Sequence, residues 1–209
     1  MSNRFKNRPL SFSQLNSWEH DKEQWYDNYV LGKRSPTNHN MRAGNVIGDS
    51  IGTPNSYVPD LQPPGTKEFK LDARLGDIWL VGYADHFCPT TLELHENKTS
   101  TNPKRWTQGQ ADKHKQLTMY ALMLFLKHNI PPEEVTMYLN FIPLVQRADY
   151  RICLPEPPVY RQFPTRRTSE QIAEYAEEIE QTVADMEACI AEFSTVETLD
   201  QNATITVPN

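Results

Sequence analysis

The sequence predicts an α/β chain, and more narrowly an α+β arrangement, from three observations. Residues 69–75, 78–87 and 92–99 alternate apolar and polar side chains and are joined by short turns, which predicts an antiparallel meander. Residues 110–128 place apolar side chains at helical spacing, which predicts a long helix directly after the meander. Residues 135–145 have the composition of a further strand, so strands and helices are expected to share one core.

Length and composition indicate one globular domain over residues 1–209. Hydrophobic residues make up 38% of the chain and charged residues 23%, which excludes a disordered chain. We place the core at about residues 10–154, followed by a helix at 168–193 and a loose tail at 195–209. The net charge of −6 argues against a surface coated with basic side chains, but it is compatible with a nucleic-acid enzyme whose positive charge is local.

Three cysteines, Cys88, Cys153 and Cys189, lie far apart in the sequence. They form no C-x-x-C pair, which excludes a zinc ribbon and an iron–sulfur cluster held by four thiolates. A reducing cytoplasm is the compartment that this use of cysteine favours. The first ten residues lack the apolar core of a signal peptide, and no apolar run is long enough to cross a membrane.

The N-terminal third is predicted to hold two helices. Residues 11–30 carry apolar side chains at helical spacing, with Ser11 or Ser13 as the N-cap. Residues 41–51 form a shorter helix that contains two glycines and an aspartate. Four prolines within residues 53–64 predict an irregular connection to the first strand.

The C-terminal third is predicted to begin with a hairpin, because residues 149–154 can pair with the end of the preceding strand. Residues 155–164 are rich in proline and are expected to form a link. The helix at 168–193 begins with Thr168 and Gln171, which resemble a capping box. Glutamates crowd the outer face of this helix, so we expect it to pack with its apolar stripe, on the core or at a subunit contact.

Two carboxylates and a lysine are predicted to converge on the hairpin at 78–99. Side chains two apart on a strand share a face, so Glu96 and Lys98 point the same way and Asn97 points to the other face. Asp85 lies on the neighbouring strand, within reach across the ladder. Oxygen ligands bind Mg²⁺, which lowers the pKa of a bound water, and an ammonium group can orient that water. Such side chains also occur on ordinary solvated sheets, so this prediction needs support from the rest of the chain.

Four sequence pieces, in order, resemble the RecB-like, phage-exonuclease branch of the PD-(D/E)XK nuclease superfamily. Each piece is weak alone, but their order and spacing are specific, and together they cover about residues 10–154. The resemblance implies a restriction-endonuclease-like core, in which helices flank a mixed central β-sheet. The four pieces are S-F-S-Q-L-N-S-W with W-Y-D-N-Y-V at 11–30, G-Y-A-D at 82–85, L-H-E-N-K-T-S at 94–100 and Q-L-T-M-Y at 116–120.

The resemblance also implies roles for four residues of the hairpin. Asp85 and Glu96 would bind Mg²⁺ or Mn²⁺, helped by the main-chain carbonyl of Asn97. Lys98 would position the attacking water. The cofactor implied is therefore a divalent ion, with no zinc and no iron–sulfur cluster.

Two helices complete the implied site. Gln116 and Tyr120 lie four residues apart, on one helix face, and would line the site or touch the DNA backbone. Many relatives place a metal-binding histidine four residues after the glycine of the second helix, but here Gly44 leads to Gly48. Asp49 could partly substitute for it, or the site could bind fewer or weaker metal ions.

Basic residues near these motifs are candidates for holding DNA. We interpret His86 and His95 as structural or as supporting the site residues from behind, because strand parity turns them away from the neighbouring carboxylates. Trp106 fits packing better than stacking on a base. The candidate DNA-binding residues are Lys104, Arg105, Lys113, Lys115, Arg166 and Arg167.

We therefore expect a metal-dependent DNA exonuclease of recombination, repair or phage DNA metabolism. Two alternatives stay open: a structure- or sequence-selective endonuclease on the same fold, and a DNA-binding or assembly protein whose catalytic site has decayed. The expected partners are DNA and, as options, a single-strand annealing or other recombination protein and further copies of this chain. The expected location is the cytoplasm of a bacterium or of a phage-infected host, with no membrane association.

Overall fold

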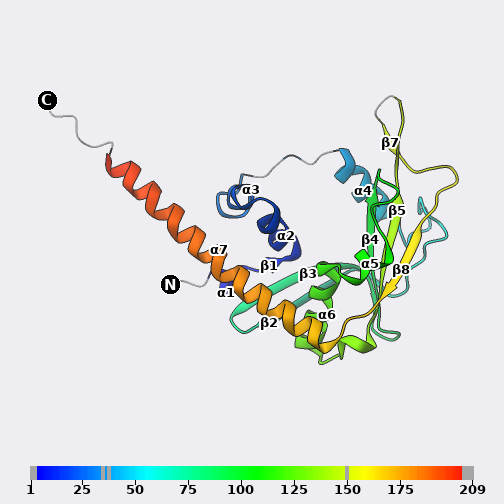
Figure 1. Ribbon diagram of the computed structural model, residues 1–209. Helices are drawn as coiled ribbons and strands as arrows, with labels where there is room; N and C mark the ends of the chain where they lie inside the picture. The colour runs from blue at the N-terminus through cyan, green and yellow to red at the C-terminus, as the bar shows by residue number, and fades with distance from the viewer. Residues whose placement is uncertain (1–3, 34–35, 37–38, 149–150, 204–209) are drawn as a thin grey trace.

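A mixed sheet forms the centre of the computed structural model, which describes residues 4–33, 36, 39–148 and 151–203. Its strand order is β1–β3–β4–β5–β8, with β2 paired to β3. Helices pack on this sheet (Figure 1), so the predicted mixed sheet flanked by helices is confirmed. The strands are β1 (Leu10–Ser11), β2 (Thr66–Leu75), β3 (Ile78–Cys88), β4 (Glu93–Ser100), β5 (Thr136–Pro143) and β8 (Arg161–Thr165).

The predicted meander is present, but β3 and β4 separate early. Strand β2 pairs with β3 along its length, from Thr66 opposite Phe87 to Leu75 opposite Ile78. On the other edge of β3, β4 pairs over three residues and β1 pairs in parallel over two, at Leu80 and Val81. Residues 82–85 of β3 therefore have no recorded strand partner on that edge, and we call this stretch the β3 gap.

Strand β8 corrects the prediction of a proline-rich link at 155–164. It runs antiparallel to β5 at the edge of the sheet. An edge strand tolerates Pro164 because the missing N–H can face away from the ladder. The predicted hairpin before it is present as β6 (Val145–Gln146) and β7 (Ile152–Cys153), although its residues 149 and 150 lie outside the described residues.

The predicted helix at 11–30 is divided into three parts. They are α2 (Phe12–His20), α3 (Lys22–Trp25) and a π-helical turn, η1 (Tyr26–Val30), and a short α1 (Arg4–Asn7) precedes them. Ser11 caps α2 by accepting from the Gln14 N–H, as expected. The division falls at Asp21, whose backbone is extended and whose carboxylate accepts from the Gln24 N–H to start α3. The side-chain cap competes with a continuous helix at this residue.

The predicted helix at 110–128 is also interrupted. It forms α5 (Gln108–Asp112) and α6 (Lys115–His128), with Lys113 and His114 between them. Helix α4 (His39–Ser50) agrees with the helix predicted at 41–51. A short 3₁₀ turn, η2 (Pro132–Glu134), leads from α6 into β5.

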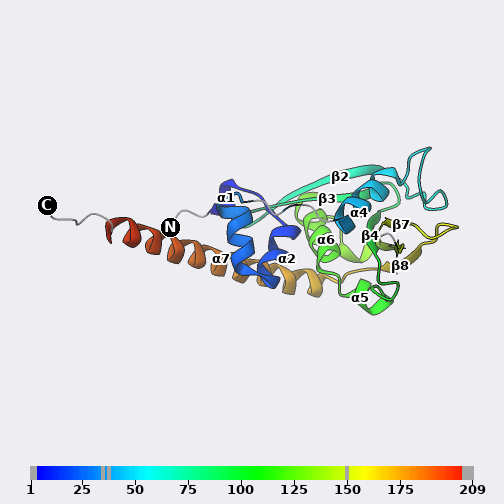
Figure 2. The same ribbon diagram turned by 90° about the horizontal axis from the view of Figure 1, so that it is seen from above.

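Helix α7 (Ser169–Ala203) corrects the expected loose tail, because it continues as helix to residue 203. Residues 204–209 lie outside the described residues. The predicted capping box is confirmed, since the Thr168 N–H donates to Gln171 and the Gln171 N–H donates to the Thr168 hydroxyl. In both views α7 runs along the domain and its C-terminal part extends beyond it (Figures 1 and 2).

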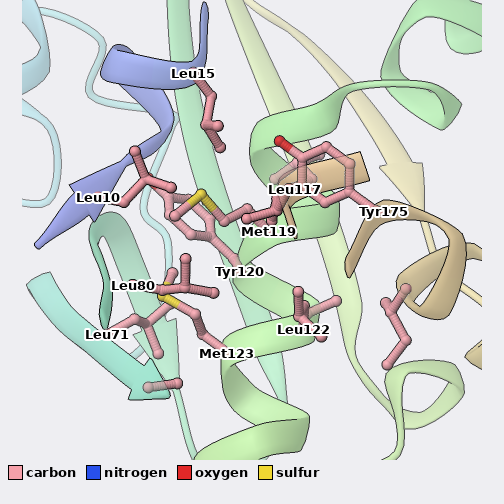
Figure 3. Packing of buried hydrophobic residues seen from close by; sticks show 14 of the residues in the cluster. Leu10, Leu15, Leu71, Leu80, Leu117, Met119, Tyr120, Leu122, Met123 and Tyr175 are labelled. Atoms are coloured by element: carbon pink, nitrogen blue, oxygen red, sulfur yellow. The ribbon is translucent and has the colours of Figure 1, made fainter. Parts of the chain in front are cut away.

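The main core lies between the sheet, α6 and α7. Leu71 and Leu80 from the sheet meet Tyr120 and Met123 of α6, and Tyr175 of α7 closes the other side (Figure 3). A smaller second core lies under α4 and the loop that follows it. It consists of Ile47, Ile51, Val58, Leu61, Ile142 and Leu144.

Candidate active site

Asp85 lies at the end of the β3 gap, where β4 leaves β3. The Asn97 N–H donates to Asp85 Oδ2 at 2.5 Å, so a carboxylate takes a position where strand pairing would otherwise continue. On its other edge β4 continues to pair in parallel with β5 over eight residues, from Glu93 to Ser100. The fork between β3 and β4 therefore places Asp85 beside the next residues of β4.

A chain of hydrogen bonds leads from Glu96 on β4 into helix α6. Lys98 Nζ donates to Glu96 Oε1 and to Gln116 Oε1, each at 2.7 Å. Gln116 Nε2 lies 2.6 Å from the Tyr120 hydroxyl, which donates to the main-chain oxygen of Tyr83 at 2.8 Å. The structure thus joins the predicted glutamate, lysine, glutamine and tyrosine in one network.

Gly82 makes room for this network. A Cβ at this position would lie 2.7 Å from Tyr120 Cε1, closer than side chains approach one another. Any larger residue would push the tyrosine ring away from β3 and lengthen the bond to Tyr83. The glycine of the G-Y-A-D piece therefore has a packing role that spacing in the sequence alone does not show.

The two carboxylates fit a bound cation. Glu96 is 4% exposed, and its Oε2 atom is buried without a hydrogen-bond partner. Burial raises the pKa of the Asp85 carboxyl well above its ordinary value, and the charge of Glu96 raises it further. Lys98 pairs with Glu96 Oε1 alone, so the partnerless Oε2 and the neighbouring Asp85 carboxyl stay costly unless a further positive charge compensates them.

A metal ion here would have few protein ligands. Among the described residues, no three histidine, cysteine, aspartate or glutamate side chains are placed to hold a metal ion together. The candidate ligands are the carboxylates of Asp85 and Glu96 and the carbonyl of Asn97, with water for the remaining positions. This donor set suits Mg²⁺, which keeps several of its waters in proteins.

A cavity of about 350 Å³ opens beside the fork. Gly44 allows α4 to approach β4 closely, since a Cβ there would lie 2.7 Å from Thr99 Oγ1. A Cβ on Gly48 would meet nothing within 4 Å, so this glycine leaves cavity volume that a side chain could fill. The lining residues are Met41, Gly44, Asn45, Gly48, Asp49, Glu68, Asp85, Asn97, Lys98, Thr99 and Ile142.

Glu68 is a cavity residue that sequence reasoning missed. The pairings on either side of it, at Lys67 and Phe69, place it opposite Asp85. Its φ of 50° is in the left-handed region, which is uncommon for a residue other than glycine, asparagine or aspartate. The charge of Glu68 also contributes to the raised pKa of Asp85. Its sequence signal was weak because it lies before the expected start of the first strand.

Three of the predicted DNA-binding cations, Lys104, Arg105 and Lys113, are exposed and accessible. Lys115 instead bridges two helices, at 3.1 Å from Glu19 and 2.6 Å from Glu178. These partners offset its charge, so Lys115 is a weaker candidate for a phosphate contact than the three exposed cations.

Arg166 and Arg167 differ from each other. Arg166 is exposed and donates to the Glu133 carbonyl and to the Thr136 hydroxyl. Arg167 is 1% exposed, so its predicted contact with DNA is wrong. Its guanidinium is held inside the protein by neutral oxygens, and burial lowers the pKa of Arg167 to about 10. These acceptors are Thr118 Oγ1, Thr165 Oγ1 and the carbonyls of Ala111, His114 and Arg166.

The histidines of the hairpin point away from the fork, as strand parity predicted. His86 and His95 are paired across β3 and β4 and are both buried. His86 packs against Gly52, and His95 stacks on Tyr138. Burial lowers the pKa of His86 to about 4, so it is neutral in the fold near pH 7.

Trp106 is half-buried and its ring lies 4.9 Å from that of His114. This contact is consistent with the packing role that the sequence favoured. None of the helices in the described residues is both long and apolar enough to span a membrane.

No protein-family model matches the chain, and no curated protein does so. Several solved structures match it. A phage-related exonuclease from Haemophilus somnus is 12% identical with a TM-score of 0.57, and the match covers 91% of this chain and 92% of that one. The alkaline exonuclease LHK-Exo from Laribacter hongkongensis is 16% identical with a TM-score of 0.52, over 96% and 95% of the two chains.

LHK-Exo in complex with dAMP is also 16% identical, with a TM-score of 0.53 over 98% of both chains. At these identities the likeness concerns the fold. The chain thus has, over nearly its whole length, the fold of these exonuclease structures.

Proposed function

We propose that this chain is a Mg²⁺- or Mn²⁺-dependent DNA exonuclease of the RecB-like, phage-exonuclease branch of the PD-(D/E)XK nucleases. The observation that carries the proposal is the fork of β3 and β4. It gathers Asp85, Glu96 and Lys98 beside a cavity, with Gln116 hydrogen-bonded to the lysine. The fold shared with exonuclease structures supports it.

Each residue of the fork has a distinct task in this proposal. Asp85, Glu96 and the Asn97 carbonyl hold the divalent ion, which when bound lowers the pKa of water and offsets charge on the phosphate. Lys98 orients the attacking water or neutralises a phosphate oxygen. Because Gln116 already fixes the ammonium group, little ordering is left to complete when DNA arrives.

The substrate path would pass over the exposed Lys104, Arg105 and Lys113, whose charges can pair with phosphates. We further propose that the enzyme acts in recombination, repair or phage DNA metabolism in the cytoplasm. Its partners there would be a single-strand annealing or other recombination protein, or further copies of the chain.

End-labelled linear, nicked and covalently closed circular DNA, incubated with Mg²⁺, Mn²⁺ or chelator, tests the proposal. We expect linear DNA to be shortened from an end with either ion, and closed circles to stay intact. Lys98→Ala should reduce cleavage by about 10²-fold to 10³-fold. The matched control is Lys127→Ala, which removes a lysine that pairs with Asp72 near the far end of α6.

The outcomes separate the alternatives. Cleavage of closed circles would contradict the exonuclease proposal and support an endonuclease on the same fold. DNA binding without cleavage under either ion would indicate a binding protein with a decayed site. Equal cleavage by the wild type and Lys98→Ala would contradict the assignment of the fork.

A further inference from the structure

A second hollow lies on the other side of helix α4 from the cavity. Met41, Asn45 and Gly48 line the cavity, whereas Arg42 and Val46 line the second hollow. These two sets follow helical spacing and lie on different faces of α4. The second hollow, which we call the α4 groove, has a volume of about 450 Å³ and is completed by Tyr57 and by residues 152–154 of the β7 region.

The floor of the α4 groove is held in place by the small second core. Ile47 is buried in that core, and Ala43, Ile152 and Leu154 pack against it. Two side chains stand above this floor, since Val46 is 56% exposed and Tyr57 is 54% exposed. An apolar floor on a rigid support, with an exposed aromatic ring, is a surface on which flat apolar groups can pack.

Arginine side chains lie at or next to the apolar floor. Among the described residues that line the groove, Arg42 is the one that carries a charge. Arg147 lies next to the groove, because its Nε donates to the sulfur of Cys153, and Cys153 lines the groove. Arg151 precedes the lining residue Ile152 and is exposed. Arg42 therefore places a positive charge beside a floor whose described lining residues include no acid.

An apolar floor with an exposed aromatic ring and a neighbouring positive charge fits single-stranded DNA better than an apolar protein helix. Single strands bind where bases stack on aromatic and apolar side chains while phosphates meet cations. A protein segment that buried Val46 and Tyr57 would gain little from Arg42 at the rim unless it were also acidic. The position supports the same conclusion, because one helix separates the groove from the cavity, and a helix with its side chains is about 10–12 Å across.

We propose that the α4 groove binds single-stranded DNA that continues beyond the nucleotide in the cavity. The inference rests on the proposed function, because it places a DNA strand at the fork. One base packs on Tyr57 beside Val46, and a flanking phosphate pairs with Arg42. The groove would hold the strand in register without reading its sequence.

Binding of a fluorescein-labelled oligothymidylate, followed by anisotropy in chelator so that no hydrolysis occurs, tests the groove. Tyr57→Ala should weaken binding about tenfold, the loss expected for one stacked base. The matched control, Phe125→Ala, removes an aromatic residue that is 40% exposed on α6 and should leave binding unchanged. Arg42→Ala should reduce the slope of log K against log salt by about 0.7.

An oligonucleotide that lacks bases at alternate positions sharpens the test. If Tyr57 stacks on a base, the difference between the wild type and Tyr57→Ala should shrink with this ligand, while the effect of Arg42→Ala should persist. Unchanged binding of intact oligothymidylate by Tyr57→Ala would overturn the proposal and leave a protein occupant as the alternative.

The two proposals can fail separately. If the wild type cleaves DNA but Tyr57→Ala binds the oligonucleotide normally, the groove proposal fails alone. If the wild type cleaves no DNA but binds the oligonucleotide through Tyr57, the groove stands and the exonuclease proposal fails. Because Tyr57 is exposed, its variant should keep the wild-type Tm, which confirms that the fold is intact.

Discussion

Two cations meet the start of helix α6 from opposite faces, and their surroundings differ. Lys98 contacts Gln116 and extends toward the cavity. Arg167 contacts the carbonyl of His114 and the hydroxyl of Thr118, and at about 100° per residue these positions are turned away from Gln116. Both side chains fix the same part of the helix.

The acceptors decide which of these cations is available for chemistry. Lys98 binds a carboxylate whose other oxygen has no partner, beside a cavity large enough for a phosphate group. Arg167 donates five hydrogen bonds to neutral oxygens and is closed off from solvent. A basic residue beside α6 is therefore a functional candidate when it borders a cavity and its acidic partner keeps an oxygen without a hydrogen bond.

The largest expected effect is on catalysis at Lys98. We expect Lys98→Ala to reduce the cleavage rate by about 10²-fold to 10³-fold, because one preorganised donor contributes about that much to transition-state stabilisation. DNA binding in chelator should change little, which a mobility-shift titration checks. A large loss of binding would show that Lys98 acts mainly on the DNA and would weaken the contrast with Arg167.

Arg167→Met should reduce the free energy of unfolding by about 3 kcal/mol, because it leaves several buried oxygens without donors. Urea denaturation measures this loss, and Arg167→Lys should recover part of it. The cleavage rate per folded molecule should fall much less than in Lys98→Ala. If Arg167→Met kept normal stability but lost DNA binding, Arg167 would bind DNA and would not be a structural residue.

Gln116→Ala should lower the cleavage rate by about 10-fold to 100-fold, since Lys98 would lose the amide that orients it. The effect should appear in kcat more than in KM, because Gln116 acts through the lysine. Gln181→Ala, on the outer part of α7, is the matched control. A change confined to KM would place Gln116 in substrate binding instead.

The pKa of Asp85 predicts opposite effects of pH with and without metal. Its value is raised above 3.8, so the folded protein binds more protons, and without metal its contribution to stability is lost as pH rises from about 4 through the raised pKa. Metal binding needs the ionised carboxylate, so stabilisation by Mg²⁺ should grow over the same range. Tm measured from pH 4 to pH 9 in Mg²⁺ or chelator tests this. Asp85→Asn should flatten both trends, and a Mg²⁺ effect independent of pH would contradict the assignment.

The smallest effects are expected at the surface cations. Lys104→Ala combined with Arg105→Ala should reduce the salt slope of duplex binding by about 1.8, the value for two phosphate contacts. Lys115→Ala should leave the slope unchanged, because Glu19 and Glu178 already pair with that lysine. If Lys115→Ala reduced the salt slope as much as the double change does, Lys115 would contact DNA after all.

The sequence predicted the parts of the fold that depend on local patterns. The meander, the helix with Gln116 and Tyr120, and the cap at Thr168 follow from alternation, helical spacing and side-chain hydrogen bonds between near neighbours. Strand β8 was missed because prolines usually exclude a strand, and its edge position becomes apparent in the assembled sheet.

The site was predictable in its residues more than in its geometry. Asp85, Glu96 and Lys98 could be selected from their spacing, but the early separation of β3 and β4 shows only in the assembled sheet, where β4 leaves β3 after three pairs and continues along β5. The positions of Glu68 and Arg167 were also not predictable from sequence spacing. Glu68 reaches the cavity through a left-handed backbone, and Arg167 is buried by residues that precede it by about 50 positions.

Arg167 also has a consequence for dissecting the protein. The side chain that ties the end of α5 to the start of α6 comes from beyond residue 154, the limit that motif matching set for the core. A fragment that stopped there would retain every proposed ligand and the lysine, yet its glutamine-bearing helix would begin without its anchor. Minimal versions of this protein should therefore be designed around the Arg167 anchor rather than around the motifs.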